Sequence, residues 1–488
     1  MTGQTVTGSV SPPGAGQGVG MAIDSQRSSR LSTPGVDHAA HYRQRARVGD
    51  ALGIALWLTS ALAVALFLLS GGTARFGSIA DAVTSVGIMT GLVGTNLVLA
   101  MLLLAARVPF IDKAIGHDRA IAVHRALGKP AFYLLLGHAL ILLVGYGLSS
   151  GIDPIAEIGP ILAIPDMILA ILGFALLAVV IVTSTVLVRR RFSYESWHLM
   201  HLLSYAAVLA SVPHQLSIGS VLSPLSFERV YWLALYILAF GAILTHRLAE
   251  PLISSLRHRL RVDRMQPEAP GVVSIYLSGR RLRSLESVGG QFFVWRFWTA
   301  GTWWHSHPIS LSSVATDTEL RITVRDLGGG SRSISSVPAG TRVWFEGPYG
   351  IFTDAGRTAP KLAIVVAGIG ITPVRAMLED SLLKPGEASI LLRASTVDDT
   401  FLWGEIEQLA REKGIAVTTM IGPRARTGPG WMTQADADSG LTILGVFPDL
   451  LESDLYLCGP TSWLNVVEED ARAAGIPDHQ VHAERFDW

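Results

Sequence analysis

The stretch AVHRALGKPAFYLLLGHALILLVGYGL, residues 122–148, decides the fold of the N-terminal half of the chain. It is apolar over enough residues to cross a hydrocarbon core of about 30 Å as one helix. Two histidines, His124 and His138, interrupt the apolar run. Because a polar ring inside a bilayer is costly, this stretch predicts a membrane helix that carries a functional histidine site.

Comparable apolar runs lie on both sides of this stretch. We predict six transmembrane helices, near residues 51–70, 84–106, 122–148, 162–188, 197–219 and 230–249. The composition agrees, since 49% of the 488 residues are apolar and only 16% are charged, against about 25% charged in an average soluble protein. Arginine and lysine gather in alternate connections, among them Arg189–Arg191 and Arg257–Arg261. This alternation predicts an integral protein of the cell membrane with both termini in the cytoplasm.

The remainder of the chain predicts a tail and two further domains. Residues 1–46 are rich in Gly, Ser and Pro, which predicts a disordered cytoplasmic tail ahead of the helical bundle over 47–252. Short alternating runs, such as Val272–Leu277 and Leu320–Val324, predict an antiparallel β-barrel over 253–355. From Lys361 onward, buried strands alternate with helical stretches, which predicts a parallel α/β domain over 356–488.

Composition also excludes several kinds of site. The chain has 39 basic and 39 acidic residues, so no excess of positive charge points to nucleic acid as a partner. Cys458 is the only cysteine, which excludes an intramolecular disulfide and an iron–sulfur cluster held by thiolates. Any redox chemistry must therefore use organic cofactors or a metal held by histidine.

Four histidines are the candidate metal ligands. His124 and His138 lie fourteen residues apart on the third predicted helix, and His201 and His214 lie thirteen apart on the fifth. These steps span ~21 and ~20 Å along a helix, so the two helices can frame two stacked haems, each held by two histidines. Fourteen residues return within about 40° of the starting face, whereas thirteen miss it by about 140° unless Pro213 bends the fifth helix.

Two alternatives stay open for these polar residues. His198 competes with His201 for the position nearer the cytoplasm, and each histidine could instead form hydrogen bonds between helices. Arg125 and Lys129, just after His124, could pair with haem propionates or serve only as the positive charge of a cytoplasmic connection.

Two segments of the predicted barrel have the features of a flavin site. In His307-Pro308-Ile309-Ser310, the hydroxyl of Ser310 could reach a flavin ring nitrogen, with Ile309 packed along the cofactor. One strand later, the run Arg325 to Ser331 offers backbone N–H groups that could hold a pyrophosphate, from small residues that include Gly328, Gly330 and Ser331.

The α/β region has the features of a nucleotide site. A glycine-rich turn follows the strand Lys361–Ala367 and opens a helix, which presents N–H groups to a phosphate through Gly368, Gly370, Ile371, Thr372 and Pro373. Cys458, Gly459 and Pro460 end a later strand at the same edge of the sheet. Arg393, with Arg424 as a second candidate, could hold a 2′-phosphate, which favours NADPH over NADH.

These segments together resemble the ferric reductase/NADPH oxidase superfamily, in which a six-helix ferric-reductase-like membrane domain precedes a ferredoxin–NADP reductase-type module. The resemblance also rests on Glu346-Gly-Pro-Tyr-Gly350 and on the terminal Glu484-Arg-Phe-Asp-Trp488. It implies FAD, NAD(P)H and two b-type haems as cofactors. It further implies that Cys458 lies near the reactive carbon of the nicotinamide and that Trp488 stacks on the flavin. Ile309 departs from the aromatic residue common in the family, a modest change in ring packing.

The resulting functional hypothesis is a transmembrane reductase. Electrons would pass from NAD(P)H through FAD and the two haems to a small-molecule acceptor at the outer face, with Ser310, Cys458 and Trp488 acting in the reaction. A ferric chelate is favoured as the acceptor. Reduction of O₂ to superoxide, transfer to a membrane or periplasmic protein, and a bundle without haem that only anchors a flavin reductase stay open as alternatives.

Overall fold

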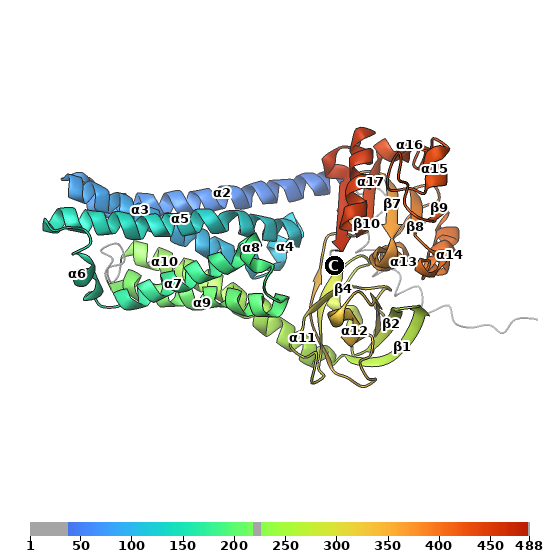
Figure 1. Ribbon diagram of the computed structural model, residues 1–488, viewed down its shortest axis with the longest axis horizontal. Coiled ribbons are helices and arrows are strands. Elements are labelled where there is room, and N and C mark those ends of the chain that lie inside the picture. The colour runs from blue at the N-terminus through green and yellow to red at the C-terminus, as the bar shows by residue number, and fades with distance from the viewer. Residues whose placement is uncertain (1–37, 218–225, 487–488) are drawn as a thin grey trace, which may run out of the picture. The chain divides into compact units, whose positions relative to one another are not determined.

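The computed structural model describes residues 38–217 and 226–486. They form two compact units, Tyr42–Ile351 and Phe352–Asp487, which are described separately here (Figure 1). The first unit contains the helical bundle and two antiparallel sheets, and the second contains one parallel sheet with its helices.

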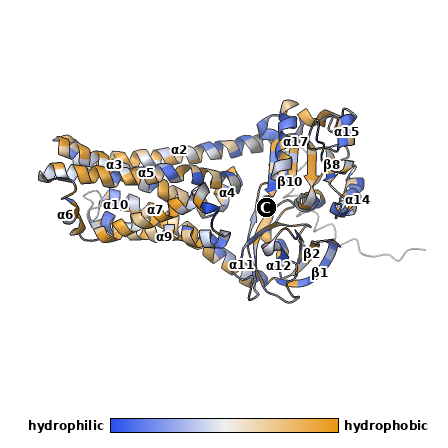
Figure 2. Cartoon of the chain, viewed as in Figure 1, coloured by the Kyte–Doolittle hydropathy of each residue, from blue (hydrophilic) through white to orange (hydrophobic). Residues whose placement is uncertain are grey.

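The bundle of the first unit consists of long apolar helices joined by short ones, and Figure 2 shows hydrophobic residues along their length. The elements are α2 (His38–Gly71), α3 (Ile79–Ala105), α4 (Pro109–Ile115), α5 (His117–Ser150), α6 (Ile158–Leu162), α7 (Met167–Ser184), α8 (Val186–Arg189), α9 (Tyr194–Ser217), α10 (Phe227–Ile243), the π-helical segment η3 (Leu244–Ala249) and α11 (Glu250–His258). Within the described ranges, five helical stretches are long and apolar enough to cross a membrane, and α9 is not among them. Its three histidines make it more polar, so the sixth predicted span stays a prediction.

The two ends of the bundle differ from the sequence-based expectation. Helix α2 begins at His38, inside the segment 1–46 that we expected to be a tail, while residues 1–37 lie outside the described residues. The last helix does not stop at 249 but continues through η3 and α11 to His258. Pro251 lies inside this continuous helix, just after the π-helical segment η3, and its missing N–H removes one helical hydrogen bond there without ending the helix.

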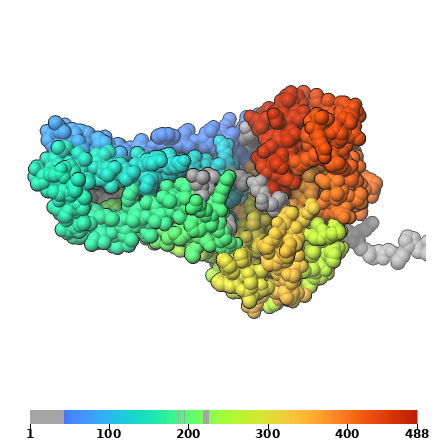
Figure 3. Space-filling view, viewed as in Figure 1, coloured from blue at the N-terminus to red at the C-terminus, as the bar shows by residue number. Residues whose placement is uncertain are grey.

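The helices pack mainly as two close pairs, α3 with α5 and α7 with α9. In Figure 3, the surface formed by α2 to α5 is blue to teal and that formed by α7 to α9 is teal to green. Small residues allow the close approach, since a Cβ atom on Gly94 of α3 would lie 3.0 Å from Leu135 of α5. In the other pair, a Cβ atom on Gly173 of α7 would lie 2.7 Å from the Ala207 carbonyl oxygen. Helix α10 packs on α3 through a core that includes Leu99 and Trp232.

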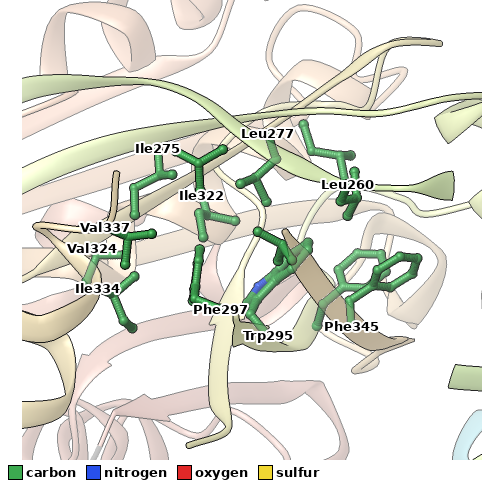
Figure 4. Packing of buried hydrophobic residues seen from close by; sticks show 14 of the residues in the cluster. Leu260, Ile275, Leu277, Trp295, Phe297, Ile322, Val324, Ile334, Val337 and Phe345 are labelled. Atoms are coloured by element: carbon green, nitrogen blue, oxygen red, sulfur yellow. The ribbon is translucent and has the colours of Figure 1, made fainter. Parts of the chain in front are cut away.

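Two three-stranded antiparallel sheets follow the bundle in the same unit. Their orders are β1-β2-β5 and β4-β3-β6. The elements are β1 (Arg261–Ala269), β2 (Val272–Ser278), β3 (Phe292–Phe297), β4 (His307–Ser310), β5 (Glu319–Arg325), α12 (Gly329–Ile334) and β6 (Val343–Tyr349). Isolated bridges from Arg261 to Arg342 and from Leu311 to Ile322 join the two sheets, and the closed barrel stays a prediction. Between the sheets lies a core that includes Trp295, Phe297 and Phe345 (Figure 4).

The second unit has a five-stranded parallel sheet of order β11-β10-β7-β8-β9, which confirms the predicted parallel α/β arrangement. The strands are β7 (Lys361–Ala367), β8 (Ala388–Ala394), β9 (Ala416–Ile421), β10 (Ser453–Pro460) and β11 (Val481–Phe486). The helices are α13 (Ile371–Asp380), α14 (Trp403–Lys413), α15 (Gln434–Asp438), α16 (Ile443–Val446) and α17 (Thr461–Ala473). Strand β7 has the bounds expected from the sequence, whereas we did not expect β11.

Candidate functional site

The bundle brings His124 of α5 and His201 of α9 together. Their ring centroids lie 6.0 Å apart, with ring planes inclined by 57°. A metal ion between two imidazoles, with bonds of about 2.0 Å and about 1.1 Å from each nitrogen to its ring centroid, places the centroids about 6 Å apart. The observed separation therefore fits a metal shared by these two rings.

The two histidines of α5 present the same ring nitrogen for ligation. His124 Nδ1 lies 3.0 Å from the Met101 carbonyl oxygen, and His138 Nδ1 lies 2.8 Å from that of Gly87, both on α3. A carbonyl oxygen can only accept, so Nδ1 carries the proton in each ring and the lone pair is on Nε2. Backbone carbonyls commonly orient metal-binding histidines in this way.

Gly91 of α3 makes room for the His138 ring. A Cβ atom at this position would lie 2.4 Å from His138 Nδ1, so any side chain here would displace the imidazole. His214 of α9 interacts electrostatically with His138 and is hydrogen-bonded to the backbone of Ser211 in its own helix. The ring separation of 6.0 Å concerns the first pair, and the second pair stays a prediction.

The remaining polar candidates of the bundle occupy different surroundings. His198 interacts electrostatically with Arg247 and Glu346, whereas the His201 ring lies 6.0 Å from that of His124 and 5.1 Å from that of Trp197. Arg125 and Lys129 are exposed on α5. Across the described ranges, no group of three or more His, Cys, Asp or Glu side chains could hold a metal ion.

A charged cluster that the sequence did not reveal links the bundle to the sheets. Glu346 of β6 accepts from Arg247 Nη1 at 2.8 Å and from Arg107 Nη1 at 3.3 Å, and Arg296 Nη2 lies 3.6 Å away. The Glu346 side chain is only 9% exposed. Three guanidinium groups around one carboxylate leave an excess of two positive charges next to the α9 face that carries His198. The partners lie 99 and 239 residues from Glu346 in the sequence, so no local pattern could have indicated them.

The predicted flavin segment is β4 itself, His307–Ser310. Ser310 is 2% exposed, and its Oγ has no hydrogen-bond partner within the described part of the chain, nor does His307 Nε2. Burial, and secondarily the nearby His305, lower the pKa of His307 to about 4, so the ring is neutral at physiological pH. Ile309 packs on the core and its carbonyl oxygen accepts from Trp295 Nε1 at 3.0 Å, while Pro308 is exposed. These two buried polar atoms lack hydrogen-bond partners, which a bound cofactor would provide.

The glycine-rich run lies beside this segment. A Cβ atom on Gly330 would lie 3.6 Å from His307 Cε1. Arg325 ends β5, and Gly328 directly precedes the short helix α12. Ser331 Oγ accepts from the Leu327 N–H at 2.8 Å, so this hydroxyl stabilises the loop. The N–H groups of the first turn of α12 are available to an anion.

In the second unit the two nucleotide motifs lie against each other. A Cβ atom on Gly370 would lie 2.4 Å from the Cys458 carbonyl oxygen and 2.8 Å from the Gly459 nitrogen, so only glycine fits there. Gly368 has a φ of +56°, and α13 begins at Ile371, two residues before Pro373. Thr372 Oγ1 donates to the Ile369 carbonyl oxygen at 3.0 Å and is therefore part of the turn.

Residues at the end of β10 add one candidate that the sequence analysis missed. Thr461 opens α17 directly after Pro460, and its Oγ1 is buried with no partner among residues that the structure describes. The signal in the sequence is its place next to the cysteine motif. Cys458 itself is fully buried, which raises the pKa of its thiol well above the ordinary value and keeps it protonated. Trp488 lies outside the described residues.

The two candidate arginines differ sharply in environment. Arg393 is 3% exposed, and its guanidinium donates to the carbonyl oxygens of Trp431 at 3.2 Å and Gly422 at 2.7 Å, and also to that of Ala394. These bonds tie it to the fold. Arg424 is exposed and interacts electrostatically with Arg393, so it is the better placed of the two for a soluble anion.

Comparisons with known proteins identify a membrane component and relatives among the reductases. Residues 90–212 match the family described as ferric reductase like transmembrane component. Ferredoxin–NADP reductase B of Sorangium cellulosum is 32% identical over 180 residues, which cover 35% of this chain and 72% of that protein. An NADPH oxidoreductase of Mycobacterium tuberculosis is 26% identical over 254 residues, which cover 49% of this chain and 62% of that protein.

Among solved structures, the flavohaem-like FAD/NAD-binding domain of nitric oxide dioxygenase from Vibrio cholerae is similar to this chain. The match has 22% identity and a TM-score of 0.39, and it covers 47% of this chain and 99% of that domain. This score is too low to carry an argument about function.

Proposed function

Since the chain belongs to the ferric reductase/NADPH oxidase superfamily, with a ferric reductase like transmembrane component and a ferredoxin–NADP reductase module, we propose that it reduces an acceptor across the membrane. The protein is a membrane-embedded oxidoreductase of the flavin and NAD(P)H class. The path we propose runs from cytoplasmic NADPH through FAD and two b-type haems to a ferric chelate at the outer face.

The flavin part of the proposal depends on the unpartnered atoms of β4. Ser310 Oγ donates a hydrogen bond to a ring nitrogen of FAD, and the neutral His307 lies beside the glycine-rich run whose N–H groups hold the pyrophosphate. FAD, when bound, takes a hydride from the nicotinamide and supplies single electrons, which is chemistry that no protein side chain here provides. The buried, unbonded Ser310 hydroxyl is the single observation that carries this assignment best.

The nucleotide part uses the edge of the parallel sheet in the second unit. The N–H group of Gly370 and the hydroxyl of Thr461 bind the phosphates and the nicotinamide end of NADPH, whereas the Ile371 N–H donates to the carbonyl oxygens of Gly368 and Ile369 within the turn. We assign the 2′-phosphate to Arg424 in preference to Arg393, because the guanidinium of Arg393 is already bonded to backbone carbonyls. Cys458 contributes a neutral, apolar wall to this edge.

The haem part assigns His124 and His201 to one haem and His138 and His214 to the other. The 6.0 Å ring separation supports the first pair, and the carbonyl bonds that leave Nε2 available support both α5 ligands. These histidines would hold the two haems, which would supply one-electron transfer to an acceptor that does not bind the iron. A ferric chelate suits this outer-sphere transfer, and O₂ or a protein acceptor is the alternative.

Anaerobic reduction of the purified full-length protein tests this function. Addition of NADPH should bleach the flavin and then produce the reduced b-type haem band, and a ferric chelate added afterwards should oxidise the haem. Superoxide formed under air, detected as dismutase-sensitive reduction of cytochrome c, would instead identify O₂ as the acceptor. Full reduction of the flavin with no haem band would contradict the transmembrane path and leave only a membrane-anchored flavin reductase.

A further inference from the structure

The loop between β3 and β4 exposes three tryptophans. Trp298, Trp303 and Trp304 are 44%, 53% and 49% exposed, and Trp298 and Trp303 line a surface hollow of about 380 Å³ with Thr299 and Ala300. Indole rings bury large areas when they find a partner, so three exposed ones within seven residues are unusual on a surface that faces only water.

The loop holds these rings outward through its own hydrogen bonds. The Thr302 hydroxyl is buried and donates to the Phe297 carbonyl oxygen at 2.7 Å, and it also lies 2.7 Å from the Thr299 hydroxyl. The Trp303 N–H donates to the Thr299 carbonyl oxygen at 3.2 Å. The turn is thus bonded around Thr302, and the outward position of the tryptophans is a property of the fold.

The same loop is fixed next to the end of a membrane span. His305 Nδ1 lies 2.8 Å from Glu195 Oε1 in the first turn of α9, and the rings of Trp304 and His305 lie 4.1 Å apart, inclined by 39°. Helix α9 begins shortly after the apolar helix α7 ends at Ser184. Arg190, Arg191 and Phe192, which connect the two, are all exposed.

We propose that the Trp298–Trp304 loop, together with Arg190 and Arg191, binds the headgroup layer of the lipid bilayer, with a preference for anionic phospholipids. Tryptophan is favoured at the depth where its ring meets acyl chains and its N–H meets headgroups. Arginines next to it attract lipid phosphates. The loop is bonded through His305 to Glu195, eleven residues after the apolar helix α7 ends at Ser184, which favours lipid over a soluble protein as its occupant.

This contact has a consequence for the flavin segment. The loop leads directly into β4, so lipid that holds Trp303 and Trp304 also fixes the start of the strand that carries His307 and Ser310. The membrane surface thereby becomes a third support for the β sheets, besides the Glu346 cluster and the bond from His305 to Glu195.

A nitroxide label at residue 303 tests the proposal on the full-length protein in lipid nanodiscs of phosphatidylcholine and phosphatidylglycerol. The Trp303→Cys variant can be labelled selectively, because Cys458 is the only native cysteine and is fully buried. Trp57→Cys, 78% exposed on α2, serves as the lipid reference, and Asp317→Cys, on an exposed turn of the same sheets, serves as the water reference. Collisions with dissolved oxygen and with a water-soluble nickel chelate report the depth of each label.

We expect the label at 303 to collide with oxygen as the one at 57 does, and with nickel severalfold less than the one at 317. Collision with nickel equal to that at 317 would overturn the proposal, and so would shielding from both reagents, which would mean a protein contact.

A second measurement needs no label. Brominated lipid should quench less of the total tryptophan fluorescence in Trp303→Ser/Trp304→Ser than in the unaltered protein, and an equal quenched fraction would overturn the proposal. Trp431→Phe, which removes a fully buried ring, is the matched control and should not lower that fraction.

Discussion

Buried polar side chains of β4 and of the parallel sheet differ in their hydrogen bonding. Ser310 and His307 each bury a polar atom that lacks a partner among the described residues. Arg393 and Asp454, by contrast, are buried and bonded. Asp454 accepts from Thr358 Oγ1 at 2.7 Å, from the Ala359 N–H at 2.6 Å and from His482 Nε2 at 3.1 Å. Buried polar atoms without a partner in the protein are candidates for contact with a ligand, whereas buried polar atoms with several partners stabilise the fold.

The largest effect should follow from removal of the second histidine pair of the bundle. His138→Ala with His214→Ala should lower the reduced b-type haem absorbance per flavin to about half and keep flavin reduction by NADPH, because each haem needs its own two ligands. His198→Gln is the matched control and should keep both haems. Retention of full haem absorbance in the double variant would show that His138 and His214 do not hold a haem.

Asp454→Ala should cause the largest loss of stability. Burial alone would raise the pKa of Asp454, but the bonds from His482, Ala359 and Thr358 outweigh burial and hold that pKa below its ordinary value. Their removal should destabilise the second unit by roughly 3–5 kcal/mol, measured as the midpoint of thermal unfolding. The control Asp449→Ala, whose side chain is 59% exposed and paired with Lys361, should change little. A similar shift for both variants would contradict the structural role of Asp454.

The pKa of His307 predicts a pH dependence of stability. Between pH 6.5 and about 4, the unfolded chain binds a proton at this residue and the folded chain does not, so acid favours unfolding. Stability should therefore fall as the pH drops through this window, by at most about 3 kcal/mol. His307→Asn should flatten the dependence, and His479→Asn, at an exposed position, should not. An unchanged slope in His307→Asn would show that the ring is solvated.

Two neighbouring buried serines offer the sharpest test of the comparison. Ser312 Oγ accepts from Thr323 Oγ1 at 2.9 Å, whereas Ser310 Oγ has no partner within the described ranges. Ser310→Ala should slow flavin reduction roughly tenfold to hundredfold, about 1.4–2.7 kcal/mol, and leave the unfolding midpoint of the flavin-free protein unchanged or higher. Ser312→Ala should do the opposite and destabilise by about 1–2 kcal/mol with normal reduction. Stopped-flow absorbance and thermal unfolding separate the two results, and equal behaviour would remove the distinction.

The smallest effect concerns the choice of nucleotide. Arg424→Gln should raise the KM for NADPH about tenfold, about 1.4 kcal/mol, and leave that for NADH unchanged. Arg393→Lys should instead lower the unfolding midpoint without a change in the preference between nucleotides, since its partners are carbonyl oxygens of the fold. Steady-state kinetics with both nucleotides measure this. Loss of NADPH preference in Arg393→Lys alone would return the 2′-phosphate to Arg393.

Local patterns in the sequence predicted much of this architecture. The bounds of β7 and the glycine turn after it follow from alternation and from turn residues. Contacts between distant residues could not be predicted in this way. The sequence does not reveal that Arg107 and Arg247 meet at Glu346, or that carbonyls of a distant loop surround Arg393, because these depend on how complete elements pack. Helix α9 was predicted as a span, and its histidines both suggest a metal site and weaken its apolar signal.

From Phe227 to His258 the backbone stays helical, π segment included, and β1 starts at Arg261. The last span is therefore joined to the sheets by a continuous helix, and only two residues separate the end of this helix from β1. One residue inserted in η3 would turn everything beyond it by about 100° and advance it by about 1.5 Å. The number of residues in this one helix therefore determines how the β sheets are oriented relative to the bundle.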